Sequence, residues 1–150
     1  MTIRSVDELN ALTSIVVSLT VKYNGCNDGY FTVLNMTRFV NLKEFEVGDE
    51  CFRYVDTVYL IGLSKLERVV IGVYCFMAGN NPNSVLRING TNSLKELTIG
   101  QSSFQYYSAF EIENTPSLEV IQIGAYLKEY SSNFGRTSEL KLKSEIDNMK

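Results

Sequence analysis

One seven-residue pattern recurs four times in this chain, and its spacing constrains the fold more than any other feature. The pattern reads leucine, two variable residues, an apolar residue, a variable residue, valine or isoleucine, and glycine. Its copies are Leu42–Gly48, Leu66–Gly72, Leu94–Gly100 and Leu118–Gly124. From one glycine to the next, the first and last steps are equal and the middle step is four residues longer. A unit this short cannot bury an apolar face alone, so the pattern predicts a solenoid in which stacked coils share one core.

A second apolar pair precedes each copy of the motif. Eight residues before each leucine begins an alternating pair, namely Leu34/Met36, Val58/Leu60, Leu86/Ile88 and Phe110/Ile112. Alternation of period two is typical of a strand with one buried face. Only five residues separate Phe52 from Val58, too few for a helix on the return path. We therefore expect a β-rich solenoid with one parallel sheet built from the motif strands, a short second strand or turn on the return limb, and little helix.

The whole chain, residues 1–150, is expected to form a single domain. Residues 1–29 are an N-terminal capping unit, residues 30–124 carry the repeats, and residues 125–150 are a degenerate C-terminal unit in which the motif fades. The four-residue excess in the middle step falls in Ala78–Asn83, whose glycine, proline and asparagines are typical of a loop. Insertions in repeat proteins usually lie in loops on one face.

Two apolar triplets outside the four complete copies fit nearly the same spacing. Leu19-Thr-Val21 precedes Phe45-Glu-Val47 by about one motif step and is expected to form the first strand of the motif sheet. Leu140-Lys-Leu142 follows Phe110-Glu-Ile112 by slightly more than the longest motif step and is expected to be the last strand of the return limb. The first triplet ends an apolar stretch, Ala11–Val21, for which a signal peptide is the alternative. Acidic residues precede that stretch, which favours a cap followed by a strand.

The motif resembles that of leucine-rich repeats over about residues 30 to 124. The return-limb pair and a phenylalanine after a small residue look like the branch of that family found in bacterial and protist surface proteins. The resemblance implies that the motif strands line the concave side of a horseshoe or right-handed coil. The family carries an asparagine eight residues after the first leucine, and its ladder normally satisfies the backbone turn. That asparagine is replaced here by Glu50, Tyr74, Ser102 and Tyr126.

Stacking turns equivalent positions into columns, and the inward columns are expected to be structural. One of them predicts an aromatic spine formed by Phe52, Phe76 and Phe104, which Phe31 extends. A row of aromatic rings that grips a ligand is the alternative.

The three cysteines, Cys26, Cys51 and Cys75, follow one another at almost exactly one motif step. This spacing predicts one column of small, buried, reduced thiols. A disulfide between adjacent coils stays open as the alternative. A zinc site is not expected, because the chain has no histidine to supply a fourth ligand.

Charge alternates along two outward columns. They read Lys43, Glu67, Lys95 and Glu119, and then Glu44, Arg68, Glu96 and Val120. Opposite charges on neighbouring strands contribute roughly 0.2–1 kcal/mol per pair. We expect these charges mainly to satisfy one another and to set the stacking register, with a polar ligand surface as the alternative.

The candidate partner-binding strip is expected on the concave sheet, where it includes the less charged column next to these charges. We favour that column because interface centres are depleted in charge. The residues of the strip are Glu46, Arg68, Val70, Glu96, Thr98, Val120 and Gln122. The opposite limb carries a further outward column, Asn35, Tyr59, Arg87, Glu111 and Lys141. Tyrosine and arginine are residue types favoured at binding hot spots.

Composition argues against several functions. Without histidine, and without a glycine-rich phosphate loop, no catalytic residue, cofactor or metal is expected. A net charge of −3 and a pI near 5.0 remove the broad attraction that nucleic acid needs. No apolar run approaches the ~20 residues of a membrane span, so membrane insertion is not expected either.

These observations predict a non-enzymatic protein-recognition or scaffolding module whose partner is another protein or a peptide. One alternative is a cell-surface adhesion or carbohydrate-binding segment of a larger protein. It draws on two glycosylation acceptor triplets, Asn35-Met-Thr37 and Asn89-Gly-Thr91, expected at equivalent positions two coils apart. Another is a structural filler in a larger assembly, or an isolated or engineered repeat unit. A cytoplasmic and an extracellular location both stay open.

Overall fold

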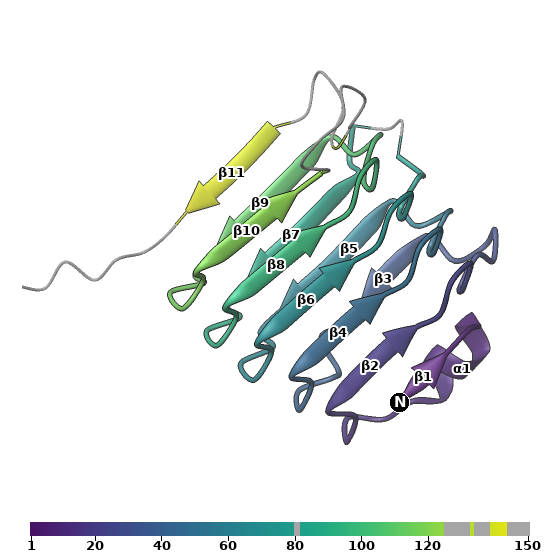
Figure 1. Cartoon of the computed structure of the whole chain (residues 1–150), viewed down its shortest axis with the longest axis horizontal. Helices are drawn as coiled ribbons and strands as arrows, with labels where there is room; N and C mark the ends of the chain where they lie inside the picture. Colours follow the sequence, from purple (N-terminus) through teal and green to yellow (C-terminus); the bar gives the residue numbers. More distant parts are fainter. Residues whose placement is uncertain (80–81, 125–132, 134–138, 144–150) are drawn as a thin grey trace, which may run out of the picture.

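The computed structural model describes residues 1–79, 82–124, 133 and 139–143. Through these residues the chain winds as a parallel β-solenoid with one short helix (Figure 1). The elements in chain order are β1 (Thr2–Ile3), α1 (Val6–Ala11), β2 (Ser18–Val21), β3 (Val33–Asn35), β4 (Glu44–Val47), β5 (Thr57–Ile61), β6 (Arg68–Ile71), β7 (Val85–Asn89), β8 (Glu96–Ile99), β9 (Ala109–Glu113), β10 (Val120–Ile123) and β11 (Glu139–Lys143). The solenoid that the repeat predicted is confirmed.

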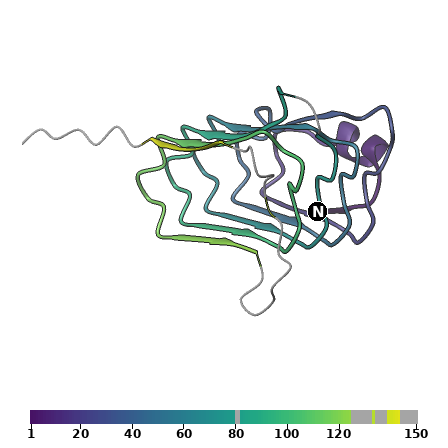
Figure 2. The ribbon, with the colours of Figure 1, turned by 90° about the horizontal axis from the view of Figure 1, so that it is seen from above.

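From β2 onward each coil contributes one strand to each of two parallel sheets, whereas β1 is followed by α1. The six-stranded sheet has the order β1-β2-β4-β6-β8-β10, and the five-stranded sheet has the order β11-β9-β7-β5-β3. The two sheets form the two layers seen in Figure 2. The motif strands thus form the expected sheet, and the return limb, where we expected only a short strand or turn, forms a complete second sheet. It does so because every return limb finds a neighbour in the same register, which satisfies its backbone N–H and C=O groups.

The register between coils follows the motif. In the six-stranded sheet Phe45 pairs with Val69, one motif step away. Leu19 pairs with Phe45, and Leu140 pairs with Phe110 in the five-stranded sheet, so both outlying triplets form the strands predicted for them. A slip of one residue would turn every inward side chain outward, so burial of one face holds this register.

The core lies between the two sheets, and the predicted aromatic spine runs along it. The rings of Phe52 and Phe76 stack with their centroids 5.1 Å apart, and those of Phe76 and Phe104 with centroids 4.6 Å apart. Phe31 extends the row, with its ring centroid 6.3 Å from that of Phe52. The three central rings are fully buried, so the spine is core rather than a ligand grip.

The N-terminal end of the solenoid is closed by α1, which lies between the two layers at that end (Figure 2). Ser5 caps this helix: its hydroxyl accepts a hydrogen bond from the Glu8 amide at 3.1 Å, and the Glu8 carboxylate accepts one from the Ser5 amide at 3.3 Å. This reciprocal capping box satisfies amides that the helix leaves unpaired. Val6 and Leu9 of the helix are buried in the core.

The C-terminal end is more open in the described part of the chain. Ile121 and Ile123 of β10 occupy inward positions of the motif, yet they are 41% and 39% exposed, whereas Leu97 one coil earlier is 1% exposed. β10 is the last strand of its sheet, so no further strand of the described residues pairs beyond these side chains. Most of the unit predicted for residues 125–150, Tyr126 included, lies outside the described residues.

The motif glycine is required by close contacts between the backbones of successive coils. A Cβ atom on Gly48 would lie 2.8 Å from the amide nitrogen of Tyr23, and one on Gly72 would lie 2.8 Å from that of Asp49. A Cβ atom on Gly100 would meet the carbonyl oxygen of Gly72. Real Cβ atoms do not approach so closely. Glycine therefore ends each motif strand because the coils stack backbone against backbone there.

Candidate functional site

Just after each motif glycine the backbone turns sharply through the left-handed region. Glu50 and Phe52 have φ angles of 60° and 54°, and Tyr74 and Phe76 both have φ angles of 54° in the next coil. Such angles are uncommon for bulky residues. The residue between each left-handed pair is small and buried; these residues are Cys51, Cys75 and Ser103.

The two thiols in these turns each bond to the preceding coil. The Cys51 thiol donates to the Lys22 carbonyl with an S···O distance of 3.0 Å, and the Cys75 thiol donates to the Gly48 carbonyl at 3.0 Å. Both carbonyls lie just after a motif strand; the Lys22 carbonyl also accepts from the Gly25 amide at 3.0 Å, whereas the thiol is the donor to the Gly48 carbonyl.

In the later coils, other side-chain groups donate the equivalent hydrogen bond to the carbonyl just after the motif strand. The Ser103 hydroxyl donates to the Gly72 carbonyl at 2.6 Å and accepts from the Cys75 amide at 2.9 Å. The Asn133 side-chain amide then donates to the Gly100 carbonyl at 2.8 Å. Thiol, hydroxyl and amide groups thus form a ladder that satisfies the turns, although the expected asparagine column is absent.

Cys26 does not belong to this ladder, and the predicted single column of three thiols is wrong. Pairing of β2 with β4 aligns Gly25, not Cys26, with Cys51. The Phe52 amide accordingly donates to the Gly25 carbonyl at 3.1 Å, and Cys26 occupies the position of the spine phenylalanine in the first coil. The sequence signal for this alignment was the step from Leu19 to Phe45, which is two residues longer than the step from Phe45 to Val69.

All three cysteines are free and buried. Burial raises the pKa of the Cys26 thiol to about 12. The pKa of Cys75 is also raised, by its hydrogen bond to Cys51 and then by burial. A protonated, buried thiol is a poor nucleophile, so the geometry favours a structural role for Cys26 and Cys75.

The outward charges form fewer ion pairs than their alternation predicted. Arg68 Nε lies 3.4 Å from Glu96 Oε2, and both side chains are partly exposed. Lys43 and Glu67 are joined through the backbone, because the Glu67 amide donates to the Lys43 carbonyl at 2.8 Å. Their side chains form no ion pair with any described residue. An exposed pair contributes only about 0–1 kcal/mol, so much of this charge stays available to a partner.

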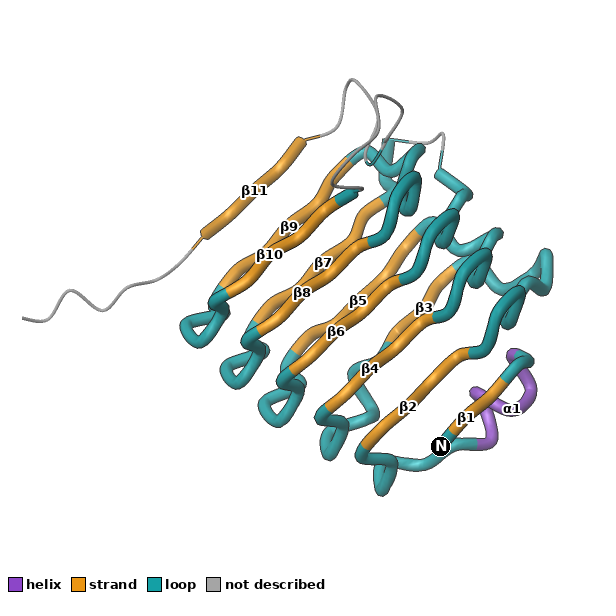
Figure 3. The backbone as a smooth tube through the Cα atoms, viewed as in Figure 1, coloured by secondary structure: helices purple, strands orange, loops and turns teal. Residues whose placement is uncertain are grey.

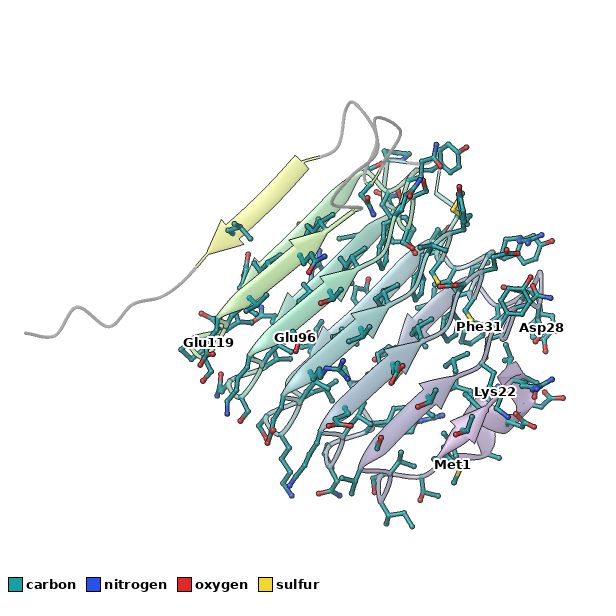
Figure 4. All side chains as sticks on the ribbon, viewed as in Figure 1. Met1, Lys22, Asp28, Phe31, Glu96 and Glu119 are labelled. Carbon is teal, nitrogen blue, oxygen red and sulfur yellow. The ribbon has the colours of Figure 1, made fainter. Side chains whose placement is uncertain are left out.

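The structure places the seven strip residues on the outer face of the six-stranded sheet. They form two adjacent rows across β4, β6, β8 and β10, namely Glu46, Val70, Thr98 and Gln122, and Arg68, Glu96 and Val120. Val70 and Thr98 are half-buried at the centre, while Glu46 and Gln122 are exposed at the two ends. No described element covers this face, on which Glu96 is labelled in Figure 4. We call these seven residues the strip.

A polar row also crosses the outer face of the five-stranded sheet, with Asn35 at its start. Arg87 Nε donates to Glu111 Oε2 at 2.7 Å, and the guanidinium carbon lies 5.6 Å from the centroid of the Tyr59 ring. Lys141 Nζ lies 3.9 Å from the other carboxylate oxygen of Glu111. The hydrogen bond to Glu111 raises the pKa of Arg87. From Tyr59 to Lys141 the predicted outward column is therefore one connected network, while the Asn35 side chain bonds to Thr37.

A shallow hollow lies beside this network, where the inserted loop meets the sheet. Its lining residues are Tyr59, Pro82, Asn83, Ser84, Val85, Arg87, Ala109 and Glu111. The spacing of the repeats predicted both the loop and the outward column, but it contained no signal that the two adjoin.

The two glycosylation triplets differ in their surroundings. Asn35 and Thr37 are exposed, and the Thr37 hydroxyl donates to Asn35 Oδ1 at 2.7 Å. Thr91 is buried, and its hydroxyl has no hydrogen-bond partner. The register pairs Asn89 with Ile61, whereas Asn35 pairs with Tyr59. The expected equivalence of the two asparagines is therefore wrong by two residues, and Asn35 is the accessible acceptor.

No group of three or more Cys, Asp or Glu side chains within the described ranges could hold a metal ion. No helix in that part of the chain is long and apolar enough to cross a bilayer. No family model, curated protein or solved structure matches this chain.

Proposed function

We propose that this chain is a non-enzymatic recognition module of the leucine-rich-repeat type, which binds a peptide or a loop of a partner protein on the strip. The observation that carries the proposal is the uncovered outer face of the six-stranded sheet, where half-buried Val70 and Thr98 lie side by side on β6 and β8. Short side chains on a rigid sheet lose little conformational entropy on binding, because they have few rotamers to lose.

Charge along the strip favours a polarised partner. On β4 the outward residues Glu44 and Glu46 are both acidic and exposed, and neither forms an ion pair with a described residue. On β10 the outward residues are Val120 and Gln122, which carry no charge. Complementary potentials steer association and set orientation. We therefore expect the bound segment to place basic residues over β4 and apolar residues over β10.

The experiment first captures partners of the full chain by cross-linking in the native source, and then measures the affinity of the captured partner by calorimetry. Replacing Val70 and Thr98 with lysine should weaken binding at least about tenfold, because two charges enter the interface centre. The matched control replaces Val33 and Val40 with lysine, which adds the same two charges at exposed positions outside the strip. Equal affinity in the strip variant and the wild type would refute the strip as the site.

A second candidate is a cell-surface or adhesion segment, and exposed Asn35 favours it. Expression in a secretory host should then give a slower-migrating band that collapses on enzymatic deglycosylation and is absent in Asn35→Gln. Asn89→Gln serves as the control, because the threonine of its triplet is buried. A chain that leaves the secretory host without a glycan would remove the observation that favours this candidate.

A further inference from the structure

Tyrosine is distributed unevenly over the surface of the solenoid. Among the described residues the exposed tyrosines are Tyr23, Tyr30, Tyr54, Tyr74 and Tyr106, with exposed fractions of 66%, 73%, 45%, 46% and 41%. All five lie in connections that run from the six-stranded sheet to the five-stranded sheet, one or two in each of four successive coils. Figure 3 shows these connections in a row along one edge, the edge toward which the strands of the six-stranded sheet point in Figure 1. We call these five residues the tyrosine edge.

The opposite edge has a different composition. Among the described residues its exposed large apolar side chains are Ile15, Val17 and Val40, and no tyrosine lies there. Tyrosine supplies a large, rigid, amphipathic contact surface at low entropic cost, and it is enriched at recognition surfaces. The asymmetry between the two edges therefore marks the tyrosine edge as an interaction surface, separate from the strip.

Two of the tyrosines occupy the same position two coils apart. The Phe76 amide donates to the Cys51 carbonyl at 3.1 Å, which fixes the alignment of neighbouring turns along the spine. Two residues beyond the spine phenylalanine the coils carry Tyr54, Ala78 and Tyr106 in turn. A small side chain thus stands between two exposed rings. Because neighbouring coils lie ~4.8 Å apart, the backbones that carry the two tyrosines are spaced by roughly 10 Å.

This spacing matches one turn of a polyproline II helix. That helix has 3 residues per turn and rises ~3.1 Å per residue, so prolines three residues apart recur every ~9 Å on one face. Its backbone carbonyls have no internal partner and can accept hydrogen bonds from tyrosine hydroxyls. Aromatic surfaces recognise such segments at low entropic cost, because the helix is already formed before binding.

The charge at this edge favours a basic ligand. The negative charge of Asp28 raises the pKa of the neighbouring Tyr30, and Lys22, Asp28 and Phe31 are labelled along the edge in Figure 4. Arg53 on this edge is paired with Glu50 at 3.7 Å. Asp28 and Asp49 form no ion pair with any described residue, so these two carboxylates outnumber Lys22, the remaining cation of the four connections. Both carboxylates belong to the turns of the first two coils, so the charge lies toward the N-terminal end of the edge.

We propose that the tyrosine edge binds a basic, proline-rich protein segment in the polyproline II conformation. Two prolines three residues apart seat against the rings of Tyr54 and Tyr106, over Ala78, and a flanking arginine lies toward Asp28. The tyrosine hydroxyls donate hydrogen bonds to the exposed carbonyls of the segment. This inference does not depend on the strip, since the two surfaces share no residue.

The test titrates the full chain with a synthetic peptide of the pattern Arg-x-x-Pro-x-x-Pro and follows binding by calorimetry and tyrosine fluorescence. Tyr54→Ala and Tyr106→Ala should each weaken binding at least about tenfold, as expected for central aromatic contacts. Ala78→Leu should also weaken it, because it fills the space between two intact rings. Val40→Ala on the opposite edge is the matched control and should bind as the wild type does. Unfolding midpoints of all variants should equal that of the wild type, since the three substituted positions of the edge are at least partly exposed.

Two further ligands make the test decisive. A peptide of the same composition with its prolines two residues apart should bind at least about tenfold more weakly, because its prolines leave the face of the helix. A β-linked hexasaccharide should not compete with the peptide. The proposal is overturned if the peptide does not bind, if binding is insensitive to both tyrosines, or if the two peptides bind equally. If the hexasaccharide binds in a tyrosine-dependent way and the peptide does not, the tyrosine edge is a glycan site and the proposal is also overturned.

Discussion

The hydroxyl of Tyr107 donates a hydrogen bond of 2.6 Å to the backbone carbonyl of Val55, two coils earlier in the solenoid. Both residues are buried and lie three positions after a spine phenylalanine. The coil between them contributes Gly79 at the equivalent position, and glycine has no side chain to block the contact. The Tyr107 ring also meets the Phe104 ring edge-on, with centroids 4.9 Å apart. One side chain therefore ties three coils together beside the inserted loop.

Removing this hydroxyl should destabilise the fold. Tyr107→Phe keeps the ring contact but leaves the buried Val55 carbonyl without its partner, which costs about 1–3 kcal/mol. Urea unfolding followed by circular dichroism measures the loss. Tyr106→Phe is the control, because Tyr106 is exposed and should unfold at the wild-type midpoint. Identical midpoints for the two variants would show that the bond contributes nothing to stability.

The motif glycine should not tolerate a side chain. In Gly72→Ala the new Cβ atom would lie 2.8 Å from the Asp49 amide nitrogen, so the two coils must separate. We expect a loss of about 1–3 kcal/mol, in the range of overpacked cores. Gly29→Ala is the matched control, because nothing lies within 4 Å of a Cβ atom there. Thermal melts of both variants test the contrast, and equal melting temperatures would contradict backbone contact as the reason for the glycine.

The ladder in the turns should accept a hydroxyl in place of a thiol. Cys75→Ser keeps a donor to the Gly48 carbonyl, as Ser103 does for the Gly72 carbonyl in the next coil. We expect it to stay within about 1 kcal/mol of the wild type, while Cys75→Ala should lose about 1–3 kcal/mol because the carbonyl becomes unsatisfied. Denaturant midpoints under reducing conditions measure both. The ladder loses its structural role if alanine is tolerated as well as serine.

Alkaline pH should destabilise the fold through Cys26. Burial raises the pKa of its thiol to about 12, whereas the unperturbed value is 9.0. Between these two values the unfolded chain releases a proton that the folded chain retains, so the free energy of unfolding falls as pH rises. Below pH 9.0 both states hold the proton, and this stability is fully present. Between pH 9.0 and about 12, the urea midpoint of Cys26→Ala should fall less steeply with pH than that of the wild type. If the two midpoints fall in parallel, Cys26 is not the cause of the alkaline destabilisation.

Much of the architecture could be predicted from the order of residues, because burial leaves a periodic trace in the sequence. The motif predicted the solenoid, the aromatic spine and the strands at Leu19 and Leu140, and all of these are confirmed. The return limb was predicted to form only a short strand or turn, yet it forms a complete sheet. Two apolar positions in each limb cannot show how many flanking residues will pair through their backbones. The strip residues share one face as predicted, and their role in binding stays a prediction.

Other features depended on contacts that no single repeat contains. The alternation of charge predicted paired ladders, yet on that face the described side chains form the Arg68–Glu96 pair, because long exposed side chains gain little by holding one geometry. The Tyr107–Val55 bond spans two coils and has no periodic signature. The tyrosine edge was missed because only Tyr54 and Tyr106 share a position in their coils, and each of the other three members occupies a position that no other member shares.

The sequence by itself therefore determined that this chain is a solenoid and which side chains face its core, since a fixed apolar period is possible only if every coil buries the same face. The tertiary structure alone joined the inserted loop to the Arg87 network and Tyr107 to the Val55 carbonyl two coils earlier. The physical reason is that both contacts involve a loop or a side chain outside the apolar repeat, and the period of the repeat carries no information about them.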